Sequence, residues 1–451
     1  MDNTFLYKSY RVLYRFDQWR KRRFTVPGLA VLYTIFITAI VGMDTHVSRV
    51  HQAFTLLLAV LVLAFIWSKF RLRVHINVTR DLPRYATAGK PLVYDVEFSN
   101  LAPKKLQDFF FYENLNDPRP TLEELSTISE PGEEKRNFWD RRILYYRWLW
   151  IISKKRILTE QLRPVPAIAA NGKLKLRVAQ TPQNRGFLRF YGVDIVRPDP
   201  LGLCNARCSI ASPQKLVVLP KRYPVPSLRL PGARKHHALG VSLASSIGNH
   251  EEFVSLREYR PGDSLRHIHW RSSAKRGELI IKEYQDEYYV RHGLLLDTFT
   301  DIAFSDLFEE AVAIAASFVC ALQTQEALLD LIFVGDQAYR FSSGRGTASV
   351  DHLLEILAAV QVCRHKPFDA IVPTVMENLH QFSSCICVLL QWDEARRAFI
   401  GDLVRRGVPV LVLVVAADDL SGPVDPGPMK HFENRFHVLK IGAIEKGLAQ
   451  L

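Results

Sequence analysis

Two long apolar runs near the start of the chain place the strongest constraint on its architecture. Residues 25–43 (TVPGLAVLYTIFITAIVGM) carry no charged side chain, and a second apolar run covers residues 50–70. About 20 apolar residues are enough for a helix to cross the hydrocarbon core of a bilayer. A signal peptide does not fit the first run, because no small-residue cleavage site follows it and a second run comes at once. The two runs therefore predict a transmembrane helical hairpin over residues 25–70.

Basic residues around these runs predict their orientation. The connection between the two runs holds a single basic residue, Arg49. Basic residues crowd the two outer flanks, in residues 1–24 and at Lys69, Arg71 and Arg73. Positively charged flanks stay on the cytoplasmic side of a membrane. We therefore expect a multi-pass protein of the inner, cytoplasmic membrane, with both termini and the main body in the cytoplasm.

The overall charge and the cysteines agree with this location. The 451-residue chain has a net charge of +13, and much of the excess lies beside apolar or aromatic sequence. That distribution favours a membrane surface over nucleic acid as the partner. The six cysteines lack the paired spacing of a zinc site, which fits a compartment that keeps thiols reduced.

Residues 71–230 show the short apolar–polar alternation of strands, as in PLVYDVEFSN and KLKLRVAQT, and predict an all-β, sandwich-like domain. An insertion at about 117–164 interrupts it and ends in the aromatic and basic stretch FWDRRILYYRWLWIISKKR. We predict that this stretch faces the membrane interface through Trp148 and Trp150, as Trp67 does at the end of the second run. Packing on the β-domain and stacking on single-stranded nucleic acid are the alternatives that the residues leave open.

The last third of the chain, residues 291–451, alternates continuous apolar strands with amphipathic helices. This order predicts an α/β domain with a parallel sheet that is covered on both faces. Ligands of such folds bind at the carboxyl ends of the strands. The acidic residues at these ends are Asp297, Asp301, Asp336 and Asp393.

Between the two domains, residues 231–290 contain a dense pattern of charged and aromatic residues. Its members are Arg257, Tyr259, Gly262, Asp263, Arg266, Ile268, Trp270 and Ala274. This pattern resembles the signature of the family called domain of unknown function 58. A second segment, RGFLRFYGVDIVRPDPLGLC, resembles another element of the family through Arg185, Gly186 and the residues Asp199 to Leu203.

The resemblance implies a membrane-anchored chain with a β-rich region, the signature, and a C-terminal domain similar to the von Willebrand factor type A fold. It also implies a MoxR-type AAA+ ATPase as a partner, in systems that assist the assembly or maturation of other proteins. No reaction is assigned to the family. We therefore expect a non-enzymatic scaffold or adaptor that binds the membrane, the ATPase and client proteins, and that binds no nucleic acid.

Type A domains hold a metal ion with a D-x-S-x-S motif, and this chain departs from that motif. It has Asp297-Thr298-Phe299-Thr300-Asp301, so Phe299 replaces one hydroxyl ligand. Asp297, Asp301 and Asp393 could still form a degenerate Mg²⁺ site, since oxygen ligands suit this ion. Alternatively, Asp297 and Asp393 cap the helices that follow their strands.

The signature itself predicts a structural clamp. Pro261 and Gly262 indicate a turn that Asp263 can cap. Arginine forms two-pronged pairs with carboxylates. We expect Leu265, Ile268 and Trp270 to pack inward, and the arginines to bridge the β-domain and the α/β-domain by pairing with carboxylates. The arginines are Arg257, Arg266 and Arg271, and the carboxylates are Glu258, Asp263 and Glu283.

A metal-dependent hydrolase that uses Asp263, His267 and His269 is the alternative. Two His residues form only half of a zinc site, and nothing selects a third ligand among the distant His236, His237 and His250. Acidic residues also lie among the basic ones, which disfavours phosphate binding by the signature.

Overall fold

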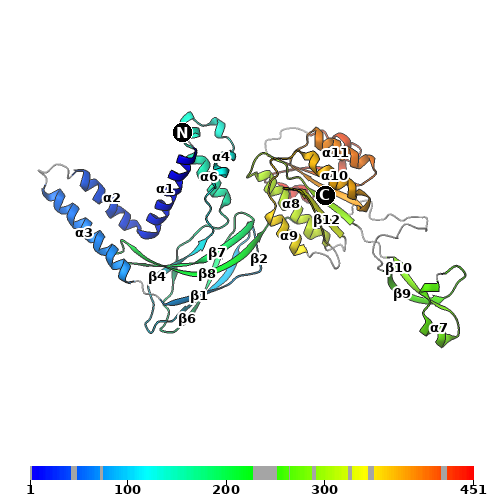
Figure 1. Ribbon diagram of the computed structural model, residues 1–451, viewed down its shortest axis with the longest axis horizontal. Helices are drawn as coiled ribbons and strands as arrows, with labels where there is room; N and C mark the ends of the chain where they lie inside the picture. Colours follow the sequence, from blue (N-terminus) through cyan, green and yellow to red (C-terminus); the bar gives the residue numbers. More distant parts are fainter. Residues whose placement is uncertain are drawn as a thin grey trace. The chain divides into compact units, whose positions relative to one another are not determined.

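A computed structural model describes residues 3–41, 48–71, 75–226, 251–263, 265–286, 291–323, 328–343, 350–417 and 424–451. The protein is a mixed α/β chain with several separate sheets (Figure 1). It divides into two compact units. The first unit comprises Met1–Arg222, Phe299–Ala316 and Leu354–His365, and the second comprises Tyr223–Thr298, Ser317–Leu353 and Lys366–Leu451.

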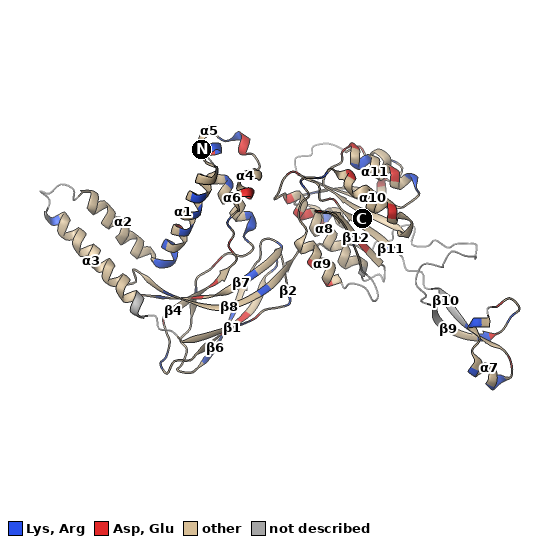
Figure 2. Ribbon diagram, viewed as in Figure 1, with Lys and Arg blue, Asp and Glu red and all other residues tan. Residues whose placement is uncertain are grey.

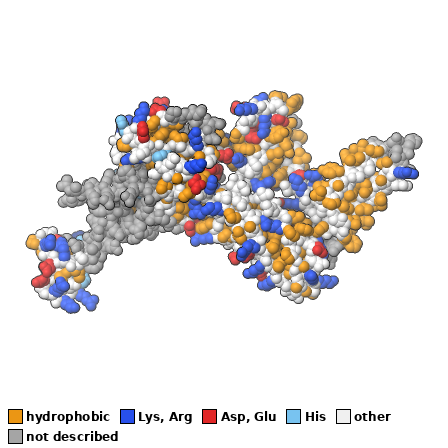
Figure 3. Space-filling view, turned by 180° about the vertical axis from the view of Figure 1, so that it is seen from behind, with side chains coloured by type: hydrophobic (Ala, Val, Ile, Leu, Met, Phe, Trp, Pro, Cys, Tyr) orange, Lys and Arg blue, Asp and Glu red, His pale blue; other side chains and the backbone are white. Residues whose placement is uncertain are grey.

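The first unit begins with three helices, α1 (Asn3–Arg23), α2 (Val26–Val41) and α3 (Ser48–Arg71). Within α3, residues 49–68 are long and apolar enough to cross a membrane, and α2 is a shorter apolar helix. Ile35 of α2 packs with Leu61 and Ala64 of α3. Hydrophobic side chains cover the visible surface of these two helices (Figure 3). The predicted connection between the spans lies outside the described residues, as do the last residues of the first predicted span.

Two sheets follow and pack face to face. The first has the order β1-β3-β6, and the second has the order β2-β8-β7-β4-β5. Their shared core includes Val96 and Phe98 from the first sheet and Phe111 and Leu188 from the second. Strand β1 alternates buried and exposed residues along its whole length, because one face of each sheet meets this core. The bounds are β1 Ile76–Asp81, β2 Tyr85–Thr87, β3 Leu92–Asn100, β4 Phe109–Leu115, β5 Arg163–Val165, β6 Lys173–Gln180, β7 Gly186–Pro198 and β8 Asn205–Leu219.

The insertion in this β-region forms the short helices α4 (Leu122–Thr127), η1 (Glu133–Lys135), α5 (Phe138–Ile143) and α6 (Tyr145–Lys155). Trp148 of α6 is only 2% exposed, because it packs with Leu6 and Tyr10 of α1 in one hydrophobic cluster. The prediction that Trp148 faces the membrane interface is therefore wrong: its apolar surface is already covered by α1. Trp150 is half-buried and Trp67 is exposed.

The second unit contains a six-stranded sheet with the order β13-β12-β11-β14-β15-β16. All neighbours in it are parallel except β13, which pairs antiparallel with β12 at the edge. The predicted parallel α/β sheet is confirmed. The strands are β11 Arg291–Leu296, β12 Leu328–Val334, β13 Ala338–Ser343, β14 Ser384–Leu389, β15 Val410–Ala416 and β16 Phe436–Lys440. The helices in this part of the sequence are α8 Asp306–Gln323, α9 Val350–Ala359, η3 Phe368–Ile371, α10 Val372–Asn378, η4 Leu379–Gln381, α11 Glu394–Arg405, η5 Gly427–Met429, η6 Glu433–Arg435 and α12 Ile444–Leu448.

The predicted signature forms a hairpin of its own. Strands β9 (Glu251–Glu258) and β10 (Ile280–Asp286) pair antiparallel in a separate two-stranded sheet. Their connection contains the 3-10 turn η2 (Leu265–His267) and the helix α7 (Trp270–Arg276). We call this segment, from Glu251 to Asp286, the signature hairpin. His236, His237 and His250, the distant ligands considered above, lie outside the described residues.

Candidate functional site

The turn at the tip of β9 is held by an ion pair between Arg257 and Asp263. The Nη1 and Nη2 atoms of Arg257 each lie 2.7 Å from a carboxylate oxygen of Asp263. The backbone N–H of Arg260 also donates to this carboxylate, at 2.8 Å. Gly262 adopts a φ of 105°, which favours glycine. The hydrogen bonds from Arg257 and from the Arg260 backbone lower the pKa of Asp263 to about 2, so this carboxylate is charged at neutral pH.

His269 starts helix α7 and is not arranged as a metal ligand. Its Nδ1 accepts a hydrogen bond from the backbone N–H of Ser272 at 3.3 Å, and it lies 2.6 Å from the Ser272 hydroxyl. This geometry is that of a helix N-cap. In the described residues, no three His, Cys, Asp or Glu side chains form a group that could hold a metal ion. With Asp263 held by Arg257 and His269 used as a cap, the geometry does not favour the hydrolase alternative.

Two apolar side chains that were predicted to pack inward are exposed on the signature hairpin. Ile268 is buried as expected, but Trp270 is 68% exposed and Leu265 is 64% exposed. A two-stranded sheet with one short helix has too little volume to cover both of these side chains. Sequence reasoning treated each apolar residue of the signature as core and took no account of the size of the element.

Two predicted members of the clamp are also exposed. The side chains of Arg266 and Arg271 are exposed, and the described part of the chain provides no ion pair for either. Lys and Arg gather on α7 (Figure 2). The pair between Arg257 and Asp263 joins two residues of one hairpin, so a bridge between domains stays a prediction. The side chain of Glu283 is outside the described part.

The carboxyl ends of β11 and β14 carry the predicted metal residues, and an arginine lies between two of them. Arg396 of α11 reaches Asp297 with Nε at 2.7 Å and Asp393 with Nη1 at 2.5 Å. Asp393 also caps α11 by accepting the Arg396 N–H at 3.0 Å. Asp297 is fully buried and accepts the Leu390 N–H at 3.0 Å.

This arrangement corrects the expectation of an Mg²⁺ site at Asp297, Asp301 and Asp393. The guanidinium of Arg396 is a cation attached to the chain, and it uses the oxygens that a metal ion would need. Burial lowers the pKa of Arg396, but the hydrogen bonds and charge of Asp297, with the charge of Asp393, outweigh this and raise it. Arg396 therefore stays charged. Asp301 is exposed. The helix-cap alternative is correct for Asp393.

A comparison with known families finds a match that covers most of the signature hairpin. Residues 255–383 match the profile of the family described as "Protein of unknown function DUF58". Residues 255–383 belong to the DUF58 family. The resemblance drawn from Arg257, Asp263 and Trp270 is therefore confirmed. The match includes the signature hairpin and continues through β11, β12, β13 and α10.

A curated relative supports the same family without adding an activity. The chain is 30% identical over 189 residues to "Uncharacterized protein YeaD" of Bacillus subtilis (strain 168), an alignment covering 41% of this chain and 45% of that protein. The chain thus spans less than half the length of this relative.

Solved structures align only weakly with the chain. Red sea bream transglutaminase aligns at 14% identity with a TM-score of 0.18, covering 32% of this chain and 15% of that chain. The CARDB domain of PF1109 from Pyrococcus furiosus aligns at 10% identity with a TM-score of 0.18, covering 34% and 92%. A β-glucosidase from Listeria innocua aligns at 12% identity with a TM-score of 0.18, covering 32% and 16%.

Sequence reasoning missed the role of the second family-like segment, Asp199 to Cys204. The carboxylate of Asp199 accepts the backbone N–H groups of Leu203 at 2.6 Å and Cys204 at 2.7 Å. The turn formed in this way directs backbone carbonyls at the start of α2: the Thr25 N–H donates to Leu203 O at 3.1 Å, and the Thr25 hydroxyl donates to Gly202 O.

Gly28 makes this contact possible. A Cβ atom at Gly28 would lie 1.9 Å from the carbonyl oxygen of Leu203, so only glycine allows the backbone of α2 to approach the turn this closely. The signal in the sequence was a glycine near the start of an apolar run, together with an Asp-Pro-x-Gly turn. Nothing in the sequence says that these two segments meet.

Proposed function

We propose that the chain is a membrane-anchored, non-enzymatic adaptor that presents its DUF58 signature hairpin to a partner protein. The observation that carries this proposal is the exposure of Trp270 on a hairpin whose turn is fixed by Arg257 and Asp263. Exposed tryptophan and arginine side chains are over-represented among the residues that dominate protein interfaces. A fixed backbone reduces the entropy lost when they bind.

The charge of this surface indicates the chemistry of the partner. Arg266, Arg271, Lys275 and Arg276 are exposed, and the last three belong to the same short helix, α7, as Trp270. A partner that complements them presents carboxylates around an apolar pocket that receives the indole. The family resemblance suggests a MoxR-type AAA+ ATPase for this role, in the assembly or maturation of other proteins at the membrane.

Three features support anchoring in a membrane. Residues 49–68 of α3 are apolar and long enough to span, and α2 packs against α3 as a second apolar helix. Helix α1 also leaves large apolar side chains exposed, at Phe5, Val12, Phe16 and Trp19. Since basic residues flank the outer ends of both apolar helices, we propose that both termini and the main body are cytoplasmic.

The C-terminal sheet supports the type A-like part of the proposal. Five parallel strands with one antiparallel edge strand form a sheet that is compatible with a von Willebrand factor type A-like domain. In this proposal Arg396 replaces the metal ion of such domains. Its ion pairs with Asp297 and Asp393 then connect the segments that follow β11 and β14 without a cofactor.

Co-purification of the full-length protein from its native membranes tests the adaptor function. Trp270→Ala and Arg271→Glu should each reduce the recovered AAA+ ATPase strongly, by about tenfold for a residue that dominates an interface. Tyr191→Ala and Arg189→Glu are matched controls, because both residues are exposed on β7 of the β-region. Recovery of equal ATPase by all four variants, or of none by the unaltered protein, would refute the proposal.

The membrane topology needs its own test, since an adaptor could bind its partner on either side of the membrane. We expect a membrane-impermeant maleimide to label Asp44→Cys in intact cells and to label Lys275→Cys only after the cells are opened. Labelling of Lys275→Cys in intact cells would reverse the orientation.

A further inference from the structure

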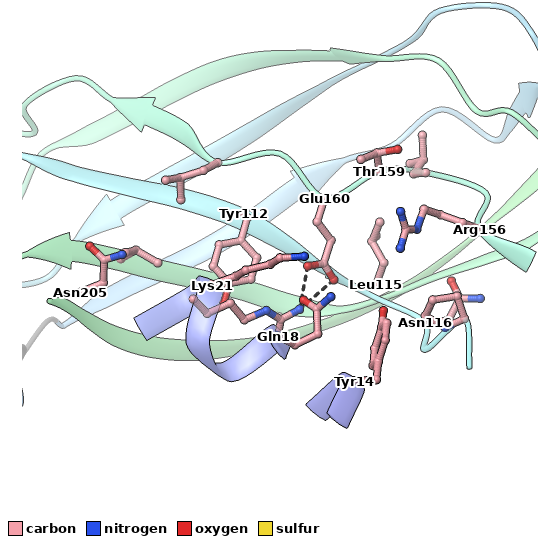
Figure 4. A pocket seen from close by; sticks show the side chains of 15 residues that line it. Tyr14, Gln18, Lys21, Tyr112, Leu115, Asn116, Arg156, Thr159, Glu160 and Asn205 are labelled. Atoms are coloured by element: carbon pink, nitrogen blue, oxygen red, sulfur yellow. Dashed lines mark hydrogen bonds and ion pairs between the residues drawn. The ribbon is translucent and has the colours of Figure 1, made fainter. Parts of the chain in front are cut away.

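A cavity of about 320 Å³ lies beside the last turns of α1 in the first unit. Helix α1, strand β4 and the segment 156–162 provide most of its lining (Figure 4). Its volume is within the range of pockets that bind small molecules. The site is separate from the signature hairpin, so its role does not depend on the adaptor function.

The charged groups that line the cavity are mostly positive. Lys21, Arg22 and Arg156 line it, and Glu160 is its one acidic lining residue. Glu160 is held by Arg22, whose Nη2 lies 2.9 and 2.7 Å from its two carboxylate oxygens (dashed lines in Figure 4). Lys21 pairs with Asp17 at 2.7 Å. For the guanidinium of Arg156, the described part of the chain provides no carboxylate, so a positive charge remains to be balanced.

Arg22 lines the cavity, and one of its side-chain donors is buried. This donor, Nε, has no hydrogen-bond partner in the part of the chain that the structure describes, although buried donors are normally satisfied. Burial lowers the pKa of Arg22, but the electrostatic interactions with Tyr112 and Glu160 outweigh it and raise this pKa, so Arg22 stays protonated. Neutral hydrogen-bonding groups, from Thr159 and Asn116, also line the cavity.

We propose that this cavity binds a phosphate group, either of a small phosphorylated molecule or of a phospholipid headgroup. Guanidinium groups form two-pronged hydrogen bonds with phosphate oxygens, and two of them line the cavity. The position is suited to a headgroup, because Arg22 is four residues before the first residue of the apolar helix α2, Val26. The three cations Lys21, Arg22 and Arg156 outnumber the carboxylates of Glu160 and Asp17, so the site keeps a positive charge that favours an anionic ligand.

Binding is tested on the full-length protein in a neutral detergent with three probes: inorganic phosphate, glycerol 1-phosphate and phosphatidylglycerol, with phosphatidylcholine for comparison. The readouts are the thermal midpoint for the soluble probes and retained lipid in native mass spectrometry. Arg156→Gln should weaken binding by about tenfold, the usual effect of losing a charge-assisted hydrogen bond. Arg189→Gln, on the exposed face of β7, is the matched control and should bind as the unaltered protein does.

Each outcome of the binding experiments either supports or contradicts the phosphate site. Saturable binding of either soluble probe that is lost in Arg156→Gln supports a site for free phosphorylated molecules. Retention of phosphatidylglycerol over phosphatidylcholine, lost in the same variant, supports a headgroup site. If no probe binds the unaltered protein, or if Arg156→Gln and Arg189→Gln bind equally, the proposal is wrong. Lys21→Gln provides a second variant should Arg156→Gln fail to fold.

Discussion

The β-region and the DUF58 signature hairpin each contain an arginine paired to a carboxylate by two nitrogen atoms, and the two pairs lie in opposite surroundings. In the β-region, Nε and Nη2 of Arg80 lie 2.9 and 2.7 Å from Oε2 of Glu113, and the side chains are 0% and 4% exposed. In the hairpin, Arg257 and Asp263 pair at 2.7 Å with 32% and 21% exposure.

The two pairs differ in how much each can contribute to the stability of the fold. Arg80 also donates to the Ser212 carbonyl at 2.7 Å, and the Tyr94 hydroxyl lies 3.3 Å from Glu113. Burial raises the pKa of Glu113 above its ordinary value, although the hydrogen bonds from Arg80 and Tyr94 oppose this. Removing one partner would therefore leave an uncompensated buried charge. The hairpin pair is solvated, so it fixes a turn and contributes little to global stability.

The largest expected effect is that of Arg80→Met. Glu113 would lose its charged partner inside the core, at a cost of about 3–5 kcal/mol in the free energy of unfolding. Urea unfolding followed by circular dichroism measures this. The double variant Arg80→Met/Glu113→Leu should recover most of the loss, because it removes both charges together. A single variant as stable as the unaltered protein would show that the pair is not buried as described.

Arg396→Leu should have an intermediate effect on the second unit. It removes the guanidinium from the buried carboxylate of Asp297, which keeps the hydrogen bond from the Leu390 N–H, whereas Asp393 is 44% exposed and can be hydrated. We expect a loss of about 2–3 kcal/mol, less than for a pair with both partners buried. Thermal unfolding of the full-length protein measures it. Arg397→Leu, one residue further along α11, is the control and should change the midpoint far less.

The ion pair between Arg257 and Asp263 should be lost at low pH without unfolding the rest of the protein. The pKa of Asp263 is lowered from 3.8 to about 2, so its contribution is fully present above pH 3.8 and is lost as the pH falls through about 2. We expect the isoleucine methyl signals of Ile268 to shift over this window in labelled protein. In Asp263→Asn this shift should be absent. A shift that persists in the variant would assign the titration to another group.

Trp270→Ala should have the smallest effect on stability. The side chain is exposed and makes little apolar contact, so the free energy of unfolding should change by less than about 0.5 kcal/mol. Differential scanning fluorimetry of the variant beside Tyr191→Ala tests this. A large loss for Trp270→Ala alone would mean that the indole packs inside the protein and is not available to a partner.

Patterns local in the sequence predicted much of the fold. The continuous apolar runs LLDLIFV and VPVLVLVVA became the buried parallel strands β12 and β15. The Pro261-Gly262-Asp263 turn was predictable because its chemistry is contained in three residues. In each case a short window contains the pattern that indicates the element, although the strands are held by partners further away in the chain.

Features that depend on distant partners were not predictable. Trp148 is buried by Leu6 and Tyr10, residues more than a hundred positions away, so its sequence neighbours indicated a membrane surface. Arg396 reaches Asp297 across 99 positions. At Asp393 the sequence indicated a helix cap or one ligand of a degenerate Mg²⁺ site. The site at the end of the sheet was therefore predicted with Asp297 and Asp393 but also with the exposed Asp301, and without the arginine that contacts the first two.

The contact between Gly28 and Leu203 has a consequence for biogenesis. Residue 203 is synthesised 175 positions after Gly28, and the Asp199 turn connects the paired strands β7 and β8. In the proposed topology the apolar helices enter the bilayer before this turn exists. The joint at the foot of α2 therefore closes last, and it closes only when the β-region has folded correctly. A chain with a misfolded β-region would be inserted in the membrane but left without its joint, a difference that a quality-control protease could detect.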